Sequence, residues 1–245
     1  MTGKLISSKL NPIFIELKKL LASKGIHKQN RFLIWGEKFT TEIASESPEV
    51  IALSIIGSKH IRPKDSYIEL SNELFAELDI FGSNSPILVC QTPNISKMKS
   101  LRPDGLELLV AVSEPSNLGA IIRSAAAFGV KKIILLKESS SPFHPKAVRA
   151  AAGNTLKLQY ELGPSIAELE PTLLAHCVAL DMAGEDLRHF KWSQNSFLLV
   201  GEEGRGIPST MKIKKVNIPM NSKIESLNAA IAISIAMYSH FVQKK

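Results

Sequence analysis

The chain has 245 residues, 44% of them hydrophobic and 22% charged, which is the composition of a folded globular protein. No apolar run is long enough to cross a bilayer, and the first residues hold no apolar core followed by a cleavage site, so we expect a cytoplasmic protein without a membrane span. Cys90 and Cys177 lie far apart and lack the Cys or His neighbours of a metal site. We expect reduced thiols and no bound metal.

The net charge of +7 is concentrated near the N-terminus, because residues 1–38 hold eight Lys or Arg against two Glu. A basic surface attracts polyanions, which makes nucleic acid a candidate partner, although basic segments also serve solubility. The side chains expected to contact nucleic-acid phosphates are Lys18, Lys19, Lys24, Lys28 and Arg31.

The first part of the chain alternates between helical and extended patterns. Apolar spacing predicts helices over 12–24 and 71–78 and strands over 31–36, 50–56 and 87–90. Strands that alternate with helices predict a small α/β domain, to which we assign residues 1–92. A polar stretch with two prolines follows, and residues 93–105 are expected to form a linker.

A second alternation of strands and helices occupies residues 106–245. The strands are short and continuously apolar, which is typical of a parallel sheet covered on both faces. Strands are predicted over 108–112, 132–136, 156–160, 177–180, 196–200 and 216–219, and helices over 117–128, 145–152, 166–175 and from 227 onward. This half is therefore predicted to be a larger α/β domain.

The first motif in this half is Glu114-Pro-Ser-Asn-Leu-Gly-Ala-Ile-Ile-Arg123, which follows a strand and opens a helix. Asn117 is suited to cap that helix. Small and apolar residues surround Arg123, so a guanidinium held near a buried surface would need a carboxylate or a phosphate. The alternative is a surface arginine whose stem lies along apolar neighbours.

The second motif is a strand that runs into Gly201-Glu-Glu-Gly-Arg-Gly206. Its glycine spacing does not match the dinucleotide fingerprint and it lacks the Lys-Ser/Thr of a phosphate-binding loop, which disfavours a dinucleotide-dependent enzyme. Carboxylates such as that of Glu203 suit a cationic or amine-bearing ligand. A tight turn with solvated acids is the alternative.

The third motif is Val216-Asn-Ile-Pro-Met220, followed by Ser226-Leu-Asn228 and an apolar helix. Taken alone, this is a core helix with Ser226 as its N-cap. The alternative is that Ser226 and Asn228 hold polar groups of a site.

Together the three motifs resemble, in order and spacing, the signature blocks of the SpoU-type (TrmH-family) RNA 2′-O-ribose methyltransferases of the SPOUT superfamily. The resemblance covers residues 106–242. Residues 1–90 are more loosely similar to the small α/β substrate-binding domain that precedes the catalytic domain in many members. The chain departs from the pattern at Glu114, where Asp is usual, and at Ala151, Ala152 and Ala230, where Ser is common.

The resemblance implies a parallel-sheet SPOUT domain with a deep trefoil knot, in which S-adenosyl-L-methionine binds in a bent form. It also implies a homodimer through the helix at 227–242, with the neighbouring subunit completing the RNA site. The residues that it assigns to the cofactor are Leu180, Gly201, Ile218, Met220 and Leu227.

The same resemblance assigns the catalytic role to Arg123, either as a base aided by an RNA phosphate or as a group that stabilises the alkoxide and grips that phosphate. Asn117 and Glu203 would orient it, and Ser226 and Asn228 would hold the polar groups of the site. Ribosomal RNA is favoured over transfer RNA, because relatives that act on transfer RNA often lack the small domain. A catalytically silent RNA-binding module of the same fold is the alternative.

Overall fold

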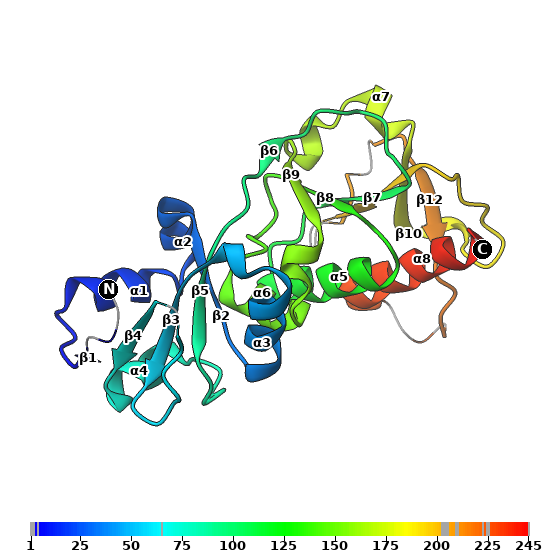
Figure 1. The fold of residues 1–245 in the computed structure, drawn as a ribbon. Coiled ribbons are helices and arrows are strands. Elements are labelled where there is room, and N and C mark those ends of the chain that lie inside the picture. Colours follow the sequence, from blue (N-terminus) through cyan, green and yellow to red (C-terminus); the bar gives the residue numbers. More distant parts are fainter. Residues whose placement is uncertain are drawn as a thin grey trace. The chain divides into compact units, whose positions relative to one another are not determined.

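The computed structural model describes residues 3, 5–64, 66–201, 206–208, 211–221, 223 and 226–244; Figure 1 shows its ribbon. The chain divides into two compact units. The first unit consists of Met1–Pro93 with Phe143–Gly153, and the second consists of Asn94–Pro142 with Asn154–Lys245. In the part of the chain that is described, no helix is long and apolar enough to span a membrane.

The first unit contains a mixed five-stranded sheet in the order β1-β4-β3-β5-β2. Strand β5 runs antiparallel to both of its neighbours, whereas β1, β4 and β3 are parallel. The strands are β1 (Leu5–Ile6), β2 (Arg31–Ile34), β3 (Ile51–Gly57), β4 (Tyr67–Leu70) and β5 (Ile87–Gln91). The helices are α1 (Pro12–Lys19), α2 (Ser23–Gln29), α3 (Glu37–Glu46), the 3₁₀ helix η1 (Pro48–Val50), α4 (Asn72–Leu78) and α6 (Pro145–Ala151).

The helix predicted over 12–24 is two helices in the structure. Helix α1 begins at Pro12, after Asn11, whose side chain accepts a hydrogen bond from the Ile13 amide. It ends before Leu20, and α2 starts again at Ser23, so Gly25 lies inside a helix instead of stopping one. Spacing alone could not show this break, because the apolar residues of the two helices continue one helical pattern.

Helix α6 belongs to the first unit, although the sequence placed residues 106–245 in one domain. The cause lies in a buried aromatic contact: the Phe143 and Phe32 rings, the second on β2, have centroids 4.9 Å apart. The Arg149 guanidinium of α6 also lies over the Phe81 ring, 5.6 Å from its centroid. A sequence pattern shows that a helix has an apolar face but not which sheet receives it.

The second unit contains a seven-stranded sheet in the order β12-β10-β11-β7-β8-β9-β6, and every pair of neighbours is parallel. The strands are β6 (Ser96–Lys97), β7 (Leu106–Val110), β8 (Lys132–Leu135), β9 (Gln159–Leu162), β10 (Cys177–Asp186), β11 (Ser196–Val200) and β12 (Lys214–Asn217). The helices are α5 (Pro115–Ala127), α7 (Pro171–Leu174) and α8 (Ala229–Gln243), with 3₁₀ helices η2 (Asn154–Lys157) and η3 (Ile166–Glu168).

The parallel sheet confirms the predicted α/β class of the second half. Successive residues of a strand face opposite sides of a sheet, and both Leu108 and Leu109 are fully buried, so both faces are covered. Leu109 lies in a core cluster with Ile166 of η3 and Leu173 of α7. Figure 1 shows α5 and α8 running side by side. The trefoil knot stays a prediction.

Part of the predicted linker is a strand. Ser96 and Lys97 of β6 pair with Glu161 and Leu162 at the edge of the sheet, and Met98 packs against the core. A strand this short carries too few residues to show a period of two, which is why its sequence indicated only a polar connection.

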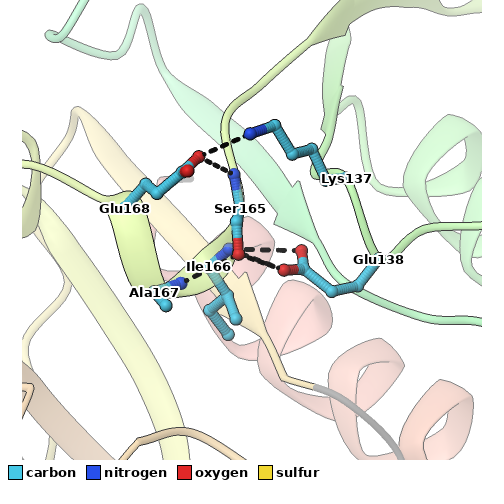
Figure 2. Close-up of polar contacts among 6 residues, drawn as sticks. All are labelled: Lys137, Glu138, Ser165, Ile166, Ala167 and Glu168. Atoms are coloured by element: carbon cyan, nitrogen blue, oxygen red, sulfur yellow. Dashed lines mark hydrogen bonds and ion pairs between the residues drawn. The ribbon is translucent and has the colours of Figure 1, made fainter.

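Figure 2 shows how the end of β8 is fastened to η3. The Glu138 carboxylate accepts hydrogen bonds from the Ser165 hydroxyl and, at 3.2 Å, from the Ile166 amide. Beside it, Lys137 forms an ion pair of 2.8 Å with Glu168. The single helix predicted over 166–175 is therefore wrong. The structure has a capped 3₁₀ turn, η3, and a separate helix α7 that starts at Pro171.

Candidate functional site

The predicted site residues of the second unit come from neighbouring strands that all point the same way. Strands β7, β11, β10 and β12 are consecutive and parallel, so the segments that follow them leave the sheet at one edge. Ligands of open α/β sheets bind at this carboxyl edge. The predicted residues in these strands or in the segments that follow them are Asn117, Leu180, Gly201, Ile218 and Met220.

The first and third motifs meet through their asparagines. The Asn228 Nδ2 group donates a hydrogen bond of 3.1 Å to Oδ1 of Asn117. Oδ1 of Asn228 accepts from the amides of Ala230, at 2.9 Å, and Ile231, at 3.3 Å. Asn228 is therefore the N-cap of α8, and the interpretation of Ser226 as that cap is wrong. The Ser226 residue is exposed and precedes the helix.

The cap of α5 also differs from the prediction. Glu114 is the N-cap residue, and its carboxylate accepts from the Ser116 amide at 3.4 Å and from the Ser116 hydroxyl at 3.0 Å. Pro115 starts the helix, because its fixed φ and missing N–H suit the first helical position. Asn117 consequently lies inside the first turn, where its side chain reaches Asn228.

Arg123 lies farther along α5 and is exposed in the single chain, whereas its neighbours Ile121 and Ile122 are fully buried. No described carboxylate forms an ion pair with its guanidinium. Arg123 follows Asn117 by six positions, which corresponds to about 9 Å along a helix.

Two of the apolar cofactor candidates pack against one cluster. Leu180 and Ile218 are half-buried and pack against the same small core of Val178, Leu187, Phe190 and Val216. Met220 and Leu227 are also half-buried. Side chains of this kind, with a few polar groups beside them, are typical of ligand pockets.

Gly201 ends β11 at a point where the chain folds back on itself. A Cβ atom at this position would lie 2.7 Å from the Gly206 carbonyl oxygen and 2.9 Å from Cγ1 of Ile207. The close approach of Gly206 and Ile207 therefore requires glycine at this position, which the resemblance assigned to the cofactor. Glu203 lies outside the described residues.

A charged pair that the motifs do not include lies at the same edge. The Lys215 ammonium of β12 is 2.7 Å from Oδ2 of Asp181 in β10. Sequence reasoning missed this pair because residues that contact each other across a sheet have no fixed spacing in the chain. The predicted strands gave no signal for it, because Asp181 follows the strand predicted over 177–180 whereas Lys215 precedes the one predicted over 216–219.

The predicted basic residues of the first unit fall into two groups. Lys18 forms an ion pair of 2.7 Å with Glu77, and Lys19 forms one of 2.5 Å with Glu16. In contrast, three exposed side chains form no ion pair with a described residue: Lys24, Lys28 and Arg31. Of the five predicted side chains, those without a described ion pair therefore lie on α2 and at the start of β2.

Neither cysteine has the surroundings of a reactive thiol. Cys90 and Cys177 are buried and unpaired, and burial raises the pKa of each to about 12. Within the described ranges, no three His, Cys, Asp or Glu side chains are grouped so that they could hold a metal ion.

The SpoU rRNA Methylase family model matches residues 107–238, a range that spans all three motifs. The chain belongs to the SpoU rRNA Methylase family. This membership confirms the family that the motifs resemble.

Relatives of this SpoU family chain are named as ribosomal RNA methyltransferases. One, a Syntrophobacter fumaroxidans protein named ribosomal RNA small subunit methyltransferase G 2, is 36% identical over 96% of the chain. The chain spans about half of that protein, 48% of its length. Another, the 23S rRNA (guanosine(2553)-2′-O)-methyltransferase RlmP of Bacillus subtilis, is 26% identical, with 96% of this chain and 98% of that protein covered.

The fold of this SpoU chain is also that of a solved rRNA methyltransferase. The crystal structure of an AdoMet-bound rRNA methyltransferase from Sinorhizobium meliloti superposes with a TM-score of 0.81 and covers 97% of each chain, at 23% identity. At this level of identity the likeness concerns the fold.

Proposed function

We propose that the chain is an S-adenosyl-L-methionine-dependent methyltransferase that modifies a ribose 2′-hydroxyl of ribosomal RNA. The observation that carries the proposal is the junction of Asn117 and Asn228, which brings the first and third family motifs together at the carboxyl edge of the parallel sheet. The names of the relatives support ribosomal RNA as the substrate. A cytoplasmic location fits this substrate.

The lining residues fit the chemical groups of the cofactor. S-adenosyl-L-methionine, when bound, supplies an activated methyl group. Its adenine is apolar on its faces, and it carries no phosphate, so no phosphate cradle is needed. We assign Leu180 and Ile218, with Met220 and Leu227, to apolar contacts with it. Backbone groups at Gly201 and Ile218 are assigned to the edge of the adenine.

Arg123 is assigned to the RNA. A guanidinium keeps its proton above pH 12, so stabilising the developing alkoxide and binding the adjacent phosphate suits it better than removing the proton. Its exposure and its lack of a described ion-pair partner leave the planar donor face free for a phosphate. Asn117 and Glu203 are assigned to its orientation, and Ser226 and Asn228 to the polar framework around it.

The experiment that tests this proposal separates cofactor binding from methyl transfer. Arg123→Ala should abolish single-turnover methylation of RNA from a deletion strain, while calorimetric affinity for S-adenosyl-L-methionine stays within a few-fold. Arg123→Lys should also fail, because a point charge does not reproduce the planar fork. Wild-type rates in Arg123→Ala would refute the assignment. A wild-type protein that binds no cofactor would instead be a catalytically silent RNA-binding module.

A homodimer through α8 is part of the proposal. Ile231, Ile235, Tyr238 and Val242 follow one another at helical spacing and are between 37% and 54% exposed, while Ile233, Ala236 and Met237 are buried against the chain. Such an apolar stripe requires cover. A second subunit packed there would complete the RNA site beside Arg123. Light scattering should show a dimer at micromolar concentration, and Ile235→Glu should convert it to a monomer.

The first unit is assigned to RNA binding through its basic residues. Lys24, Lys28 and Arg31 are exposed and free of described ion pairs, so they suit phosphate contacts directly. Lys18 and Lys19 contribute less, because their charges are already partly compensated by Glu77 and Glu16.

A further inference from the structure

The ladder between β10 and β12 is interrupted beside the proposed cofactor pocket. Val216 of β12 pairs first with Leu180 and then again with Glu185. Residues 181–184 therefore leave the ladder and return to the same partner residue. We call this excursion the 181–184 loop.

Gly184 fixes the base of the 181–184 loop against β12. A Cβ atom at this position would lie 2.5 Å from the Val216 nitrogen and 2.6 Å from the Lys215 carbonyl carbon. Both atoms are backbone, which cannot move aside without breaking the ladder. Only glycine permits this approach, so the loop follows one path back to the sheet.

Asp181 fixes the other end of the loop with both carboxylate oxygens. Oδ1 accepts a hydrogen bond of 2.9 Å from the Ala183 amide, and Oδ2 lies 2.7 Å from the Lys215 ammonium. Both side chains are 29% exposed, so water screens the pair only in part. The hydrogen bond from Lys215 lowers the pKa of Asp181, and the hydrogen bond from the Ala183 amide lowers it further.

The pair joins strand β10, which carries Leu180, to strand β12, which ends just before Ile218. Asp181 directly follows Leu180. Lys215 lies in β12, and the last two residues of that strand separate it from Ile218. Met182, at the tip of the loop, is 60% exposed. The loop held in this way therefore starts next to Leu180 and carries an exposed apolar side chain.

We propose that the Asp181–Lys215 ion pair sets the shape of the cofactor pocket and that Asp181 is a positioning residue for cofactor binding. The inference rests on the proposed function. Asp181 acts through the 181–184 loop and through Leu180, not on the methyl group or the ribose. The pair therefore controls cofactor affinity, and the rate of methyl transfer at saturating cofactor is independent of it.

Calorimetric titration of the full chain with S-adenosyl-L-methionine tests the inference. Asp181→Asn keeps an acceptor for the Ala183 amide and removes the charge, and Lys215→Met keeps the apolar stem. Each should weaken affinity by roughly three- to tenfold, about the effect of losing one partly buried ion pair. The double variant should be no weaker than either single one. Lys137→Met, which breaks the Lys137–Glu168 pair of 2.8 Å elsewhere in the same unit, is the matched control and should leave affinity unchanged.

Single-turnover methylation at saturating cofactor distinguishes positioning from general damage. Asp181→Asn should reach the wild-type rate once saturated, and the exchanged pair Asp181→Lys with Lys215→Asp should regain part of the affinity. Unchanged affinity in folded Asp181→Asn and Lys215→Met would overturn the inference and leave the proposed function standing. A wild-type chain that binds no cofactor would overturn both. Should Asp181→Asn fail to fold, Lys215→Met gives the same comparison.

Discussion

Asn228 donates a hydrogen bond of 3.1 Å to Asn117, and this contact joins the start of α8 to the start of α5 across 111 residues of sequence. The same Asn228 side chain caps α8 with its oxygen. One amide therefore has two separable tasks: its oxygen stabilises a helix and its nitrogen links two motifs.

Substitutions at Asn228 should separate these tasks. Asn228→Asp keeps a capping oxygen, and its negative charge suits a helix N-terminus, so the melting temperature should change little. It cannot donate to Asn117, so methyl transfer should fall. Asn228→Ala loses both interactions and should cost about 1 kcal/mol, or about 2–4 °C in a chain of this size. Calorimetry and single-turnover methylation measure the two effects.

Asn117→Ala is the matched comparison, because it removes the link and leaves the Asn228 cap of α8 in place. It should reproduce the methylation defect of Asn228→Asp without lowering the melting temperature by more than the loss of one partly exposed hydrogen bond. Full methylation activity in both variants would show that the link between the motifs has no part in the reaction.

Gly201→Ala should already weaken cofactor binding, and it should do so by distorting the loop after β11. The added Cβ would meet the Gly206 carbonyl oxygen at 2.7 Å. Because that obstacle is backbone, shortening the nearby Ile207 in Gly201→Ala/Ile207→Ala should not restore the affinity. Recovery in the double variant, measured by calorimetry, would identify the Ile207 side chain as the obstacle and contradict this explanation.

The family and the parallel sheet were predictable from sequence because continuous apolar strands and three ordered motifs each constrain many residues at once. The contacts within the site were less so. Asn117 is a residue type that often caps helices. The structure shows that α5 starts earlier, at Pro115, so that Glu114 is the N-cap. The same holds for Asp181 and Lys215, whose 2.7 Å contact depends on strand register.

The basic residues of the first unit should differ in their effect on RNA binding. Replacing Lys24, Lys28 and Arg31 by Gln should weaken binding and lower the slope of log affinity against log salt by about two to three, because each phosphate contact contributes close to one. Replacing Lys18 and Lys19 should change the slope less, since Glu77 and Glu16 already pair with them. Filter binding over a salt series gives both slopes. Equal slopes in the two variants would contradict the expected difference between the lysines that form ion pairs and the three side chains that do not.

Glu138 should make the stability of the second unit depend on pH. Partial burial of its carboxylate raises its pKa, but the hydrogen bonds from Ser165 and from the backbone amides outweigh this, and the net effect is a lowered pKa in the folded chain (Figure 2). A carboxyl group with a lowered folded pKa contributes stability above its unfolded pKa, which is about 4.3 for Glu. That contribution is lost as the pH falls through the folded pKa.

Glu138→Gln measures this contribution directly. It keeps one acceptor for the Ser165 hydroxyl and removes the charge, so at pH 7 it should lower the melting temperature by about 2–4 °C, the equivalent of about 1 kcal/mol for a charge-assisted hydrogen bond made neutral. The difference between wild type and variant should shrink below about pH 4 as Glu138 takes up a proton. Glu168, whose charge raises the pKa of Glu138, keeps its ion pair with Lys137 in both proteins. A difference that stays constant from pH 7 to pH 3 would show that shape, and not the charge of Glu138, fastens β8 to η3.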